Sequence, residues 1–420
     1  MNRKQLVILI VLVVILGGAG LLLRKKEASA YSSGKENSAM GQKLLGTFPV
    51  NDVTHISIKQ GTNELNLVKK DNLWRVGERK DYAANYSQIA EFLLKAQDLK
   101  VGQSEVVGPS QLPRLWLVPG NGTNAAMVVD FKDKSDKTIK SMLLGKKHMK
   151  KSDRPSPYGD MGDEGWPDGR YVKVGDSPNV AVILDPLANI EPKPEQWLNK
   201  DFFKVEKVKA ISATFPNSTT NSWKVTRENE TAEWKLADAK PNEQLDSTKT
   251  SGLNSALSSP NFNDVATSAT PEQLGLDKPT VLTLDTFEDI TYSLKVGQKT
   301  NDTYAMTVAI SAQIPKERTP GKDEKPEDKD KLDKEFKEKQ KKLEEKLEQE
   351  KAYDKWTYLV SSWTLDSVLK ERSQLLKEEP KKDEPKKGQA KSEEHKADDI
   401  LTPPLPGGGD SATSAPAAPK

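Results

Sequence analysis

The stretch DNLWRV (71–76) and the stretch TAEWKLADA (231–239) repeat one motif. Each contains a tryptophan followed by a basic and then an apolar residue, Trp74 in the first stretch and Trp234 in the second. Each also follows an alternating polar and apolar run and precedes a helix-like run. A motif that recurs with the same neighbours predicts an internal duplication.

The residues that lead to Trp74 alternate between polar and apolar. In VTHISIKQGTNELNLVKKDNLWRV (53–76), the period of two is interrupted at two short polar turns. This pattern predicts a three-stranded antiparallel meander with one buried face. The next stretch, NYSQIAEFLLKAQDLK (85–100), spaces its apolar residues at i, i+3, i+4 and i+7, which predicts one amphipathic helix.

The second half of the chain passes through the same series of patterns. Three strand-like segments (VKAISATF, NSWKVTRE and AEWKLADA) precede a weaker helix, LDSTKTSGLNSALSS, and about four further strands. The fold class that we expect is α+β: a single N-terminal transmembrane helix followed by two tandem repeats of an antiparallel β-sheet unit with one helix each. The positions that we expect to correspond are Ile56 with Ile211, Trp74 with Trp234, Leu144-Gly145 with Val296-Gly297, and Tyr171 with Tyr304.

Changes in composition set the expected domain boundaries. A charged helical insertion interrupts the second repeat, and a Pro- and Lys-rich tail is expected to be disordered. The expected segments are a transmembrane helix at 1–24, a linker at 25–50, a first repeat at 51–205, a second repeat at 206–372 with its insertion at 311–354, and a tail at 373–420.

The charged insertion carries a narrow apolar stripe at helical spacing. We expect a solvent-exposed helix that projects from a strand connection, and deletion of 315–353 to leave the fold intact. The stripe is either a feature of a solvated arm or a surface that docks a partner. Its candidate partner contacts are Leu332, Phe336, Leu343 and Leu347.

The N-terminal segment LVILIVLVVILGGAGLLL (6–23) has no charged residue and is long enough to span a bilayer. Because a large polar body follows it, we expect a single-pass anchor in a bacterial inner membrane with the bulk of the chain in the periplasm. Cleavage near Ala30, after the small residues of ASA (28–30), is the alternative.

Charge and cysteine content exclude several classes of function. The chain has 64 basic and 62 acidic residues, a balance that argues against nucleic-acid binding. The absence of cysteine excludes disulfides, thiolate metal sites and cysteine nucleophiles. The three histidines, His55, His148 and His395, are scattered, so we predict no catalytic, cofactor-binding or metal residues and no cofactor.

The loop DRPSPYGDMGDEGWPDG (153–169) is rich in carboxylates and glycine. Its spacing differs from the order of an EF-hand, so it is either a solvated acidic loop or a cation site. Its aromatic residues, Tyr158 and Trp166, together with Trp116, are candidate partner contacts. The alternative is that these rings pack back onto the sheet.

The sequence resembles the bacterial family known as domain of unknown function 4340. The resemblance covers about 45–310 and 355–370, and departs where the first half has QLPRLWLVPGNG and the second has QLGLDKP. It implies an accessory role beside an ABC-type transporter of the gliding-motility kind, and it brings no catalytic residues. The stretches that carry it are VNDVTHISIKQGTNELNLVKKDNLWRV, ANYSQIAEFLLKAQDLK, PEQLGLDKPTVLTLD, YSLKVGQ and TYAM.

Three functional hypotheses follow. The first is a non-enzymatic, membrane-anchored accessory protein that contacts ABC permease or ATPase subunits. The second is an envelope module that binds glycan or peptidoglycan through exposed aromatic residues. The third is an envelope hydrolase that uses the carboxylates of 160–168, although no nucleophile or acid–base arrangement is readable there.

Overall fold

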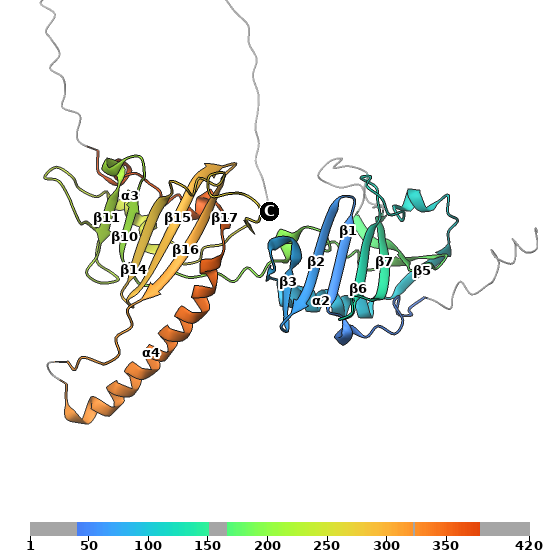
Figure 1. Ribbon diagram of the computed structural model, residues 1–420, viewed down its shortest axis with the longest axis horizontal. Helices are drawn as coiled ribbons and strands as arrows, with labels where there is room; N and C mark the ends of the chain where they lie inside the picture. Colours follow the sequence, from blue (N-terminus) through green and yellow to red (C-terminus); the bar gives the residue numbers. More distant parts are fainter. Residues whose placement is uncertain (1–39, 151–165, 322–323, 379–420) are drawn as a thin grey trace, which may run out of the picture. The chain divides into compact units, whose positions relative to one another are not determined.

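The computed structural model describes residues 40–150, 166–321 and 324–378. This part of the chain is α+β, with two antiparallel sheets and few helices (Figure 1). The predicted span at 6–23 and the tail beyond 378 lie outside the described residues. Within them, no helix has both the length and the apolar character needed to cross a membrane.

The first sheet has nine strands in the order β4-β3-β2-β1-β6-β7-β8-β9-β5. The predicted meander of β1, β2 and β3 is confirmed, and every pairing in the sheet is antiparallel. The strands are β1 His55–Gln60, β2 Asn63–Lys70, β3 Leu73–Val76, β4 Tyr82–Ala83, β5 Val101–Val106, β6 Met127–Lys132, β7 Thr138–Lys150, β8 Trp166–Val174 and β9 Asn179–Ile183.

The second sheet has eight strands in the order β12-β11-β10-β14-β15-β16-β17-β13. Apart from the added β4, this is the order of the first sheet, strand for strand. The strands are β10 Val208–Thr214, β11 Trp223–Thr226, β12 Lys235–Leu236, β13 Asp264–Val265, β14 Thr280–Thr286, β15 Ile290–Thr300, β16 Thr303–Ala312 and β17 Tyr358–Ser361.

Strand register tests the expected correspondences residue by residue. Counted along the ladders from Ile56 and Ile211, Trp74 and Trp234 occupy the same position, as predicted. The pairing of Tyr171 with Tyr304 is wrong by one residue. Tyr171 corresponds to Ala305 and Tyr304 to Arg170, so the two tyrosines lie on opposite faces of their sheets.

Gly145 and Gly297 occupy equivalent positions in β7 and β15, and each lies within the short interval where the ladder shifts register. Each glycine lets a loop carbonyl approach its strand closely. A β-carbon at Gly145 would lie 2.3 Å from the Leu115 carbonyl oxygen, and one at Gly297 would lie 1.9 Å from that of Leu274. The unlike stretches QLPRLWLVPGNG and QLGLDKP therefore cover the same bulge in the two repeats.

The predicted helix of the first repeat is α2, Tyr86–Asp98, which buries Ile89, Phe92, Leu93 and Ala96. The Asn85 side chain caps it by accepting a hydrogen bond from the Gln88 amide. In the second repeat the helix shortens to α3, Ser247–Thr250, followed by a 3-10 turn, Ser251–Ser255. Gly252 lies in that turn, in keeping with its low helix propensity.

The predicted insertion helix is α4, Lys329–Lys351, which extends away from the second sheet (Figure 1). Its C-terminal turns belong to the core rather than to solvent. Leu343 is 9% exposed, Glu350 is 7% exposed, and Leu347 packs against the buried cluster. The expectation that 315–353 can be deleted without loss is therefore wrong for these turns, because their removal would uncover the sheet.

Two further short helices, α5 Ser362–Leu365 and α6 Arg372–Leu375, close the described chain. Arg372 fastens α6 by ion pairs with Asp238 and Glu243 at 2.9 and 2.6 Å. The guanidinium holds the pKa of Glu243 down at about 2. This ion-paired segment tethers the end of the second repeat beside the loop that leads to α3.

Candidate functional site

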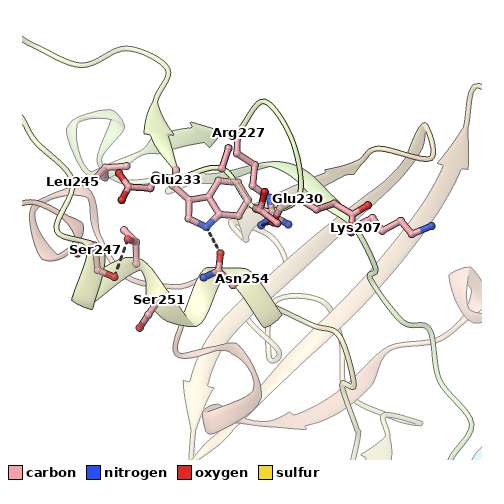
Figure 2. Close-up of a pocket in the computed structure, with 12 residues that line it drawn as sticks. Lys207, Arg227, Glu230, Glu233, Leu245, Ser247, Ser251 and Asn254 are labelled. Carbon is pink, nitrogen blue, oxygen red and sulfur yellow. Dashed lines mark hydrogen bonds between the residues drawn. The ribbon is translucent and has the colours of Figure 1, made fainter.

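A polar pocket of about 510 Å³ lies beside Trp234 in the second repeat (Figure 2). The loop between β11 and β12 forms one wall, and α3 with the following 3-10 turn forms another. The residues that line it are Lys207, Arg227, Glu230, Thr231, Ala232, Glu233, Trp234, Leu245, Ser247, Thr250, Ser251 and Asn254.

Trp234 is 9% exposed and is fixed from two sides. Its indole Nε1 donates a hydrogen bond of 2.9 Å to Asn254 Oδ1. The guanidinium of Arg227 lies over its ring, 4.6 Å from the centroid. The indole therefore forms a rigid inner wall rather than a mobile ring.

Arg227 is a buried cation without a carboxylate partner. The residue is 8% exposed; its Nε donates to the Val208 carbonyl and its Nη1 to the Glu230 carbonyl, both at 2.7 Å. Within the described residues, Nη2 has no hydrogen-bond partner. Burial lowers the pKa of the guanidinium, whereas the nearby charge of Glu230 raises it.

The rim of the pocket carries charges of both signs. Glu230 and Glu233 are exposed, and neither carboxylate forms an ion pair within the part of the chain that the structure describes. Lys207 already forms an ion pair with Glu288 at 2.6 Å, and the hydrogen bond that it donates to that carboxylate raises the pKa of the lysine. The pocket therefore presents one buried cationic edge beside two free carboxylates.

A second pocket, of about 570 Å³, lies at the equivalent place beside Trp74. Its rim differs in character, because Leu73 and Tyr86 are 57% and 67% exposed and occupy the positions of Glu233 and Ser247. An exposed Lys69 stands at the ladder position of Arg227 and does not line this pocket.

The structure distributes the predicted aromatic contacts over separate elements. Trp116 is 38% exposed and follows the 3-10 turn Leu112–Leu115, in a left-handed conformation with φ of 56°. Trp166 is the first residue of β8, at the end of the β7–β8 hairpin. Tyr158 lies outside the described residues.

The predicted contacts on α4 separate into two pairs. Leu343 and Leu347 hold the helix to the second sheet. Leu332 and Phe336, nearer the far end, are half-buried and lie outside that core. Arg318 binds Asp333 at 2.7 Å and also pairs with Glu324, so the segment that leads to the helix is clasped to it.

Sequence reasoning missed the buried state of Arg227 and the pairing of His148 with Asp168. His148 Nδ1 lies 2.6 Å from Asp168 Oδ1 across the β7–β8 hairpin. In the hairpin, His148 pairs with Gly169, the residue next to Asp168. The contact could have been predicted only if the ends of the two strands had been known. Within the described residues, no group of three or more potential metal ligands is present.

Residues 160–279 match the family model described as Domain of unknown function (DUF4340). The resemblance predicted from the sequence is confirmed for this stretch, which includes the whole pocket-forming loop around Trp234. Outside it, the resemblance over 45–310 and 355–370 remains a prediction. No curated protein and no solved structure matches the chain.

Proposed function

We propose that this protein is a non-enzymatic, membrane-anchored, extracytoplasmic accessory protein of an ABC-type transporter or a related envelope complex. The observation that carries the proposal is α4, a 23-residue helix that extends from a folded body and is fixed at its base. The uncharged segment at 6–23 would supply a single-pass anchor, with the body on the periplasmic side of a bacterial inner membrane.

The base of α4 is built to resist displacement. Glu350 Oε2 accepts a hydrogen bond of 2.7 Å from the Tyr292 hydroxyl, and its Oε1 accepts one of 3.1 Å from the Lys204 amide. Lys346 adds an ion pair of 3.0 Å with Glu206. A charged helix held in one direction is suited to present a contact surface at a distance from the sheet.

The outer part of α4 offers an apolar pair for such a contact. Leu332 and Phe336 are spaced i, i+4 and share one face of the helix. Amphipathic helices dock through anchors of this spacing into an apolar groove of the partner. A permease subunit with such a groove on its periplasmic side is the partner that the proposal names, and ATPase subunits would be recovered through that permease.

The test is crosslinking and co-purification of the full-length protein from membranes, with a double variant, Leu332→Ala with Phe336→Ala. We expect permease and ATPase subunits to be recovered near stoichiometrically with the native protein, and at least about ten-fold less with the variant. The matched control is Lys334→Ala with Lys341→Ala on the same helix, which should leave recovery unchanged. Equal recovery with both variants, or no transporter subunit with any of them, would exclude this role for α4.

A second candidate is an envelope module that binds glycan, and the exposure of Trp116 favours it. Aromatic rings that reach solvent from a loop are common contacts for ligands. A Trp116→Ala variant should then lose binding to isolated envelope material. Unchanged binding would remove Trp116 from consideration.

A further inference from the structure

We propose that the pocket beside Trp234 binds a small zwitterionic ligand of the amino-acid or short-peptide class. Arg227 would hold the carboxylate of the ligand, and Glu233, on the other side of the pocket, would face its ammonium group (Figure 2). The inference does not rest on membrane anchoring or on a transporter partner, because the pocket is formed by the second repeat itself.

The first reason is the state of Arg227. A guanidinium has five N–H donors in a fork that matches a carboxylate, and here two of its nitrogens are held by carbonyl oxygens. Removal of a cation from water is costly unless its donors are paired. Nη2 has no hydrogen-bond partner in the described chain and is open to solvent, and Arg227 lines the pocket, so Nη2 is a free donor for an anion in the pocket.

The second reason is the pair of free carboxylates at the rim. Figure 2 shows Glu230 close to Arg227 and Glu233 on the other side of the pocket. A purely anionic ligand would be repelled by both carboxylates, and a purely cationic ligand would leave Arg227 without a partner. A ligand that carries both a carboxylate and an ammonium group can pair with Arg227 and with the rim carboxylates.

The third reason is the neutral hydrogen-bonding groups between the charges. Asn254 uses its Oδ1 for the Trp234 indole, and its amide nitrogen has no hydrogen-bond partner in the part of the chain that the structure describes. The Ser247 hydroxyl also lines the pocket and has no side-chain hydrogen bond among the described residues. A donor and a hydroxyl of this kind suit a peptide group, and about 510 Å³ accommodates a dipeptide.

The equivalent pocket of the first repeat supplies an internal control. There Leu73 and Tyr86 replace Glu233 and Ser247, and Lys69 replaces Arg227 with its side chain exposed. The first pocket therefore lacks a buried arginine, and the charged residues that line it are Lys200 and Asp201. We expect the zwitterion to bind in the second repeat alone.

The test uses the full-length protein with 5-fluorotryptophan at its eight tryptophans, observed by ¹⁹F NMR. A Trp234→Phe variant assigns the signal of the pocket, and Trp74 reports on the first repeat. Three probes of similar size are titrated: glycylglycine, N-acetyl-glycylglycine, which is only anionic, and glycylglycine amide, which is only cationic. We expect glycylglycine to shift the Trp234 signal saturably, with the other two at least about ten-fold weaker and Trp74 unmoved.

Two variants locate the charges. Arg227→Lys should weaken glycylglycine at least about ten-fold, because lysine cannot form the forked contact. Glu230→Gln with Glu233→Gln, at exposed positions, should weaken glycylglycine but not N-acetyl-glycylglycine. Equal binding of all three probes, stronger binding of a singly charged probe, no shift of Trp234, or unchanged affinity in both variants would each overturn the proposal.

Discussion

The two repeats share a sheet and differ in what they attach to it. The strand order, the tryptophan at the start of the third strand and the glycine at the bulge are the same in both. At the pocket rim, by contrast, Leu73 and Tyr86 stand where the second repeat has Glu233 and Ser247. The shared tryptophan and glycine are thus of the same residue type in both repeats, whereas the exposed positions at the pocket rim differ in chemistry.

A second difference lies under the insertion helix. Tyr292 is fully buried on β15 and donates a hydrogen bond to Glu350 of α4, whereas the equivalent position on β7 is Lys140. In the first repeat the connection that corresponds to that of α4 is the short turn between β8, which ends at Val174, and β9, which begins at Asn179; the longer connection joins β7 to β8. The repeats have therefore been extended at different connections of one topology.

The largest expected effect concerns the feature that the repeats share most closely. Gly297→Ala places a β-carbon against the Leu274 carbonyl and should cost about 3 kcal/mol of unfolding free energy or more; Gly145→Ala should cost about 2 kcal/mol. Urea unfolding of both variants measures this. Gly120→Ala, which adds a β-carbon in open space, should stay within about 0.5 kcal/mol. If both bulge variants match this control, the shared bulge is not a packing constraint.

The next largest effect is expected in the second repeat, at the contact between Glu350 of α4 and the sheet. Glu350→Ala removes the acceptor of the Tyr292 hydroxyl and the Lys204 amide, and should lower the unfolding free energy by about 2 kcal/mol. The control is Glu348→Ala, an exposed neighbour on the same helix, which should change it by less than about 0.5 kcal/mol. A loss no larger than that of the control would show that the base of α4 is not part of the core.

A smaller difference in unfolding free energy is expected between substitutions of Arg227 and of its counterpart Lys69. Arg227→Lys loses the carbonyl hydrogen bonds and weakens the contact with the Trp234 ring, at a cost of about 1 kcal/mol. Lys69→Ala, at the exposed counterpart, should be near neutral. Thermal unfolding of both variants checks the comparison, and equal losses would contradict the asymmetry between the two pockets.

The smallest expected effect is a dependence of stability on pH that arises from Glu350, a residue of the second repeat. Burial raises the pKa of Glu350 above its ordinary value of 4.5. The folded state therefore binds the proton more tightly than the unfolded chain does. The stabilisation that results is fully present below pH 4.5 and is lost as pH rises through the raised pKa. Glu350→Gln should flatten this part of the curve of stability against pH, and an unchanged curve would assign the dependence to other groups.

Much of the fold could be predicted from the sequence because its main determinants are local. Alternation in 53–76 and the helical spacing after Asn85 are properties of adjacent residues, and both appear in the structure where they were predicted. Correspondence across the repeats was harder to predict. A bulge shifts the register by a residue, which is how Tyr171 was paired wrongly with Tyr304.

The candidate site depends on contacts that no local pattern contains. Arg227 reads as an ordinary surface residue that ends a strand, and its burial is decided by Trp234 and by the carbonyl of Val208 on another strand. In the same way, Leu343 and Leu332 belong to one stripe of α4. Only the position of the sheet beneath the helix decides which of them is buried.

The attachment of α4 also has a mechanical consequence. A 23-residue helix is about 34 Å long, so a tilt of about 5° at its base would carry its far end through about 3 Å. The clasp of Arg318 to Asp333 and Glu324 makes the incoming segment move together with the helix. The helix is held by all of its C-terminal turns, through Leu343, Leu347 and the hydrogen bond between Glu350 and Tyr292. A displacement of the helix near Phe336 would therefore be transmitted through these contacts to the buried residues of β15.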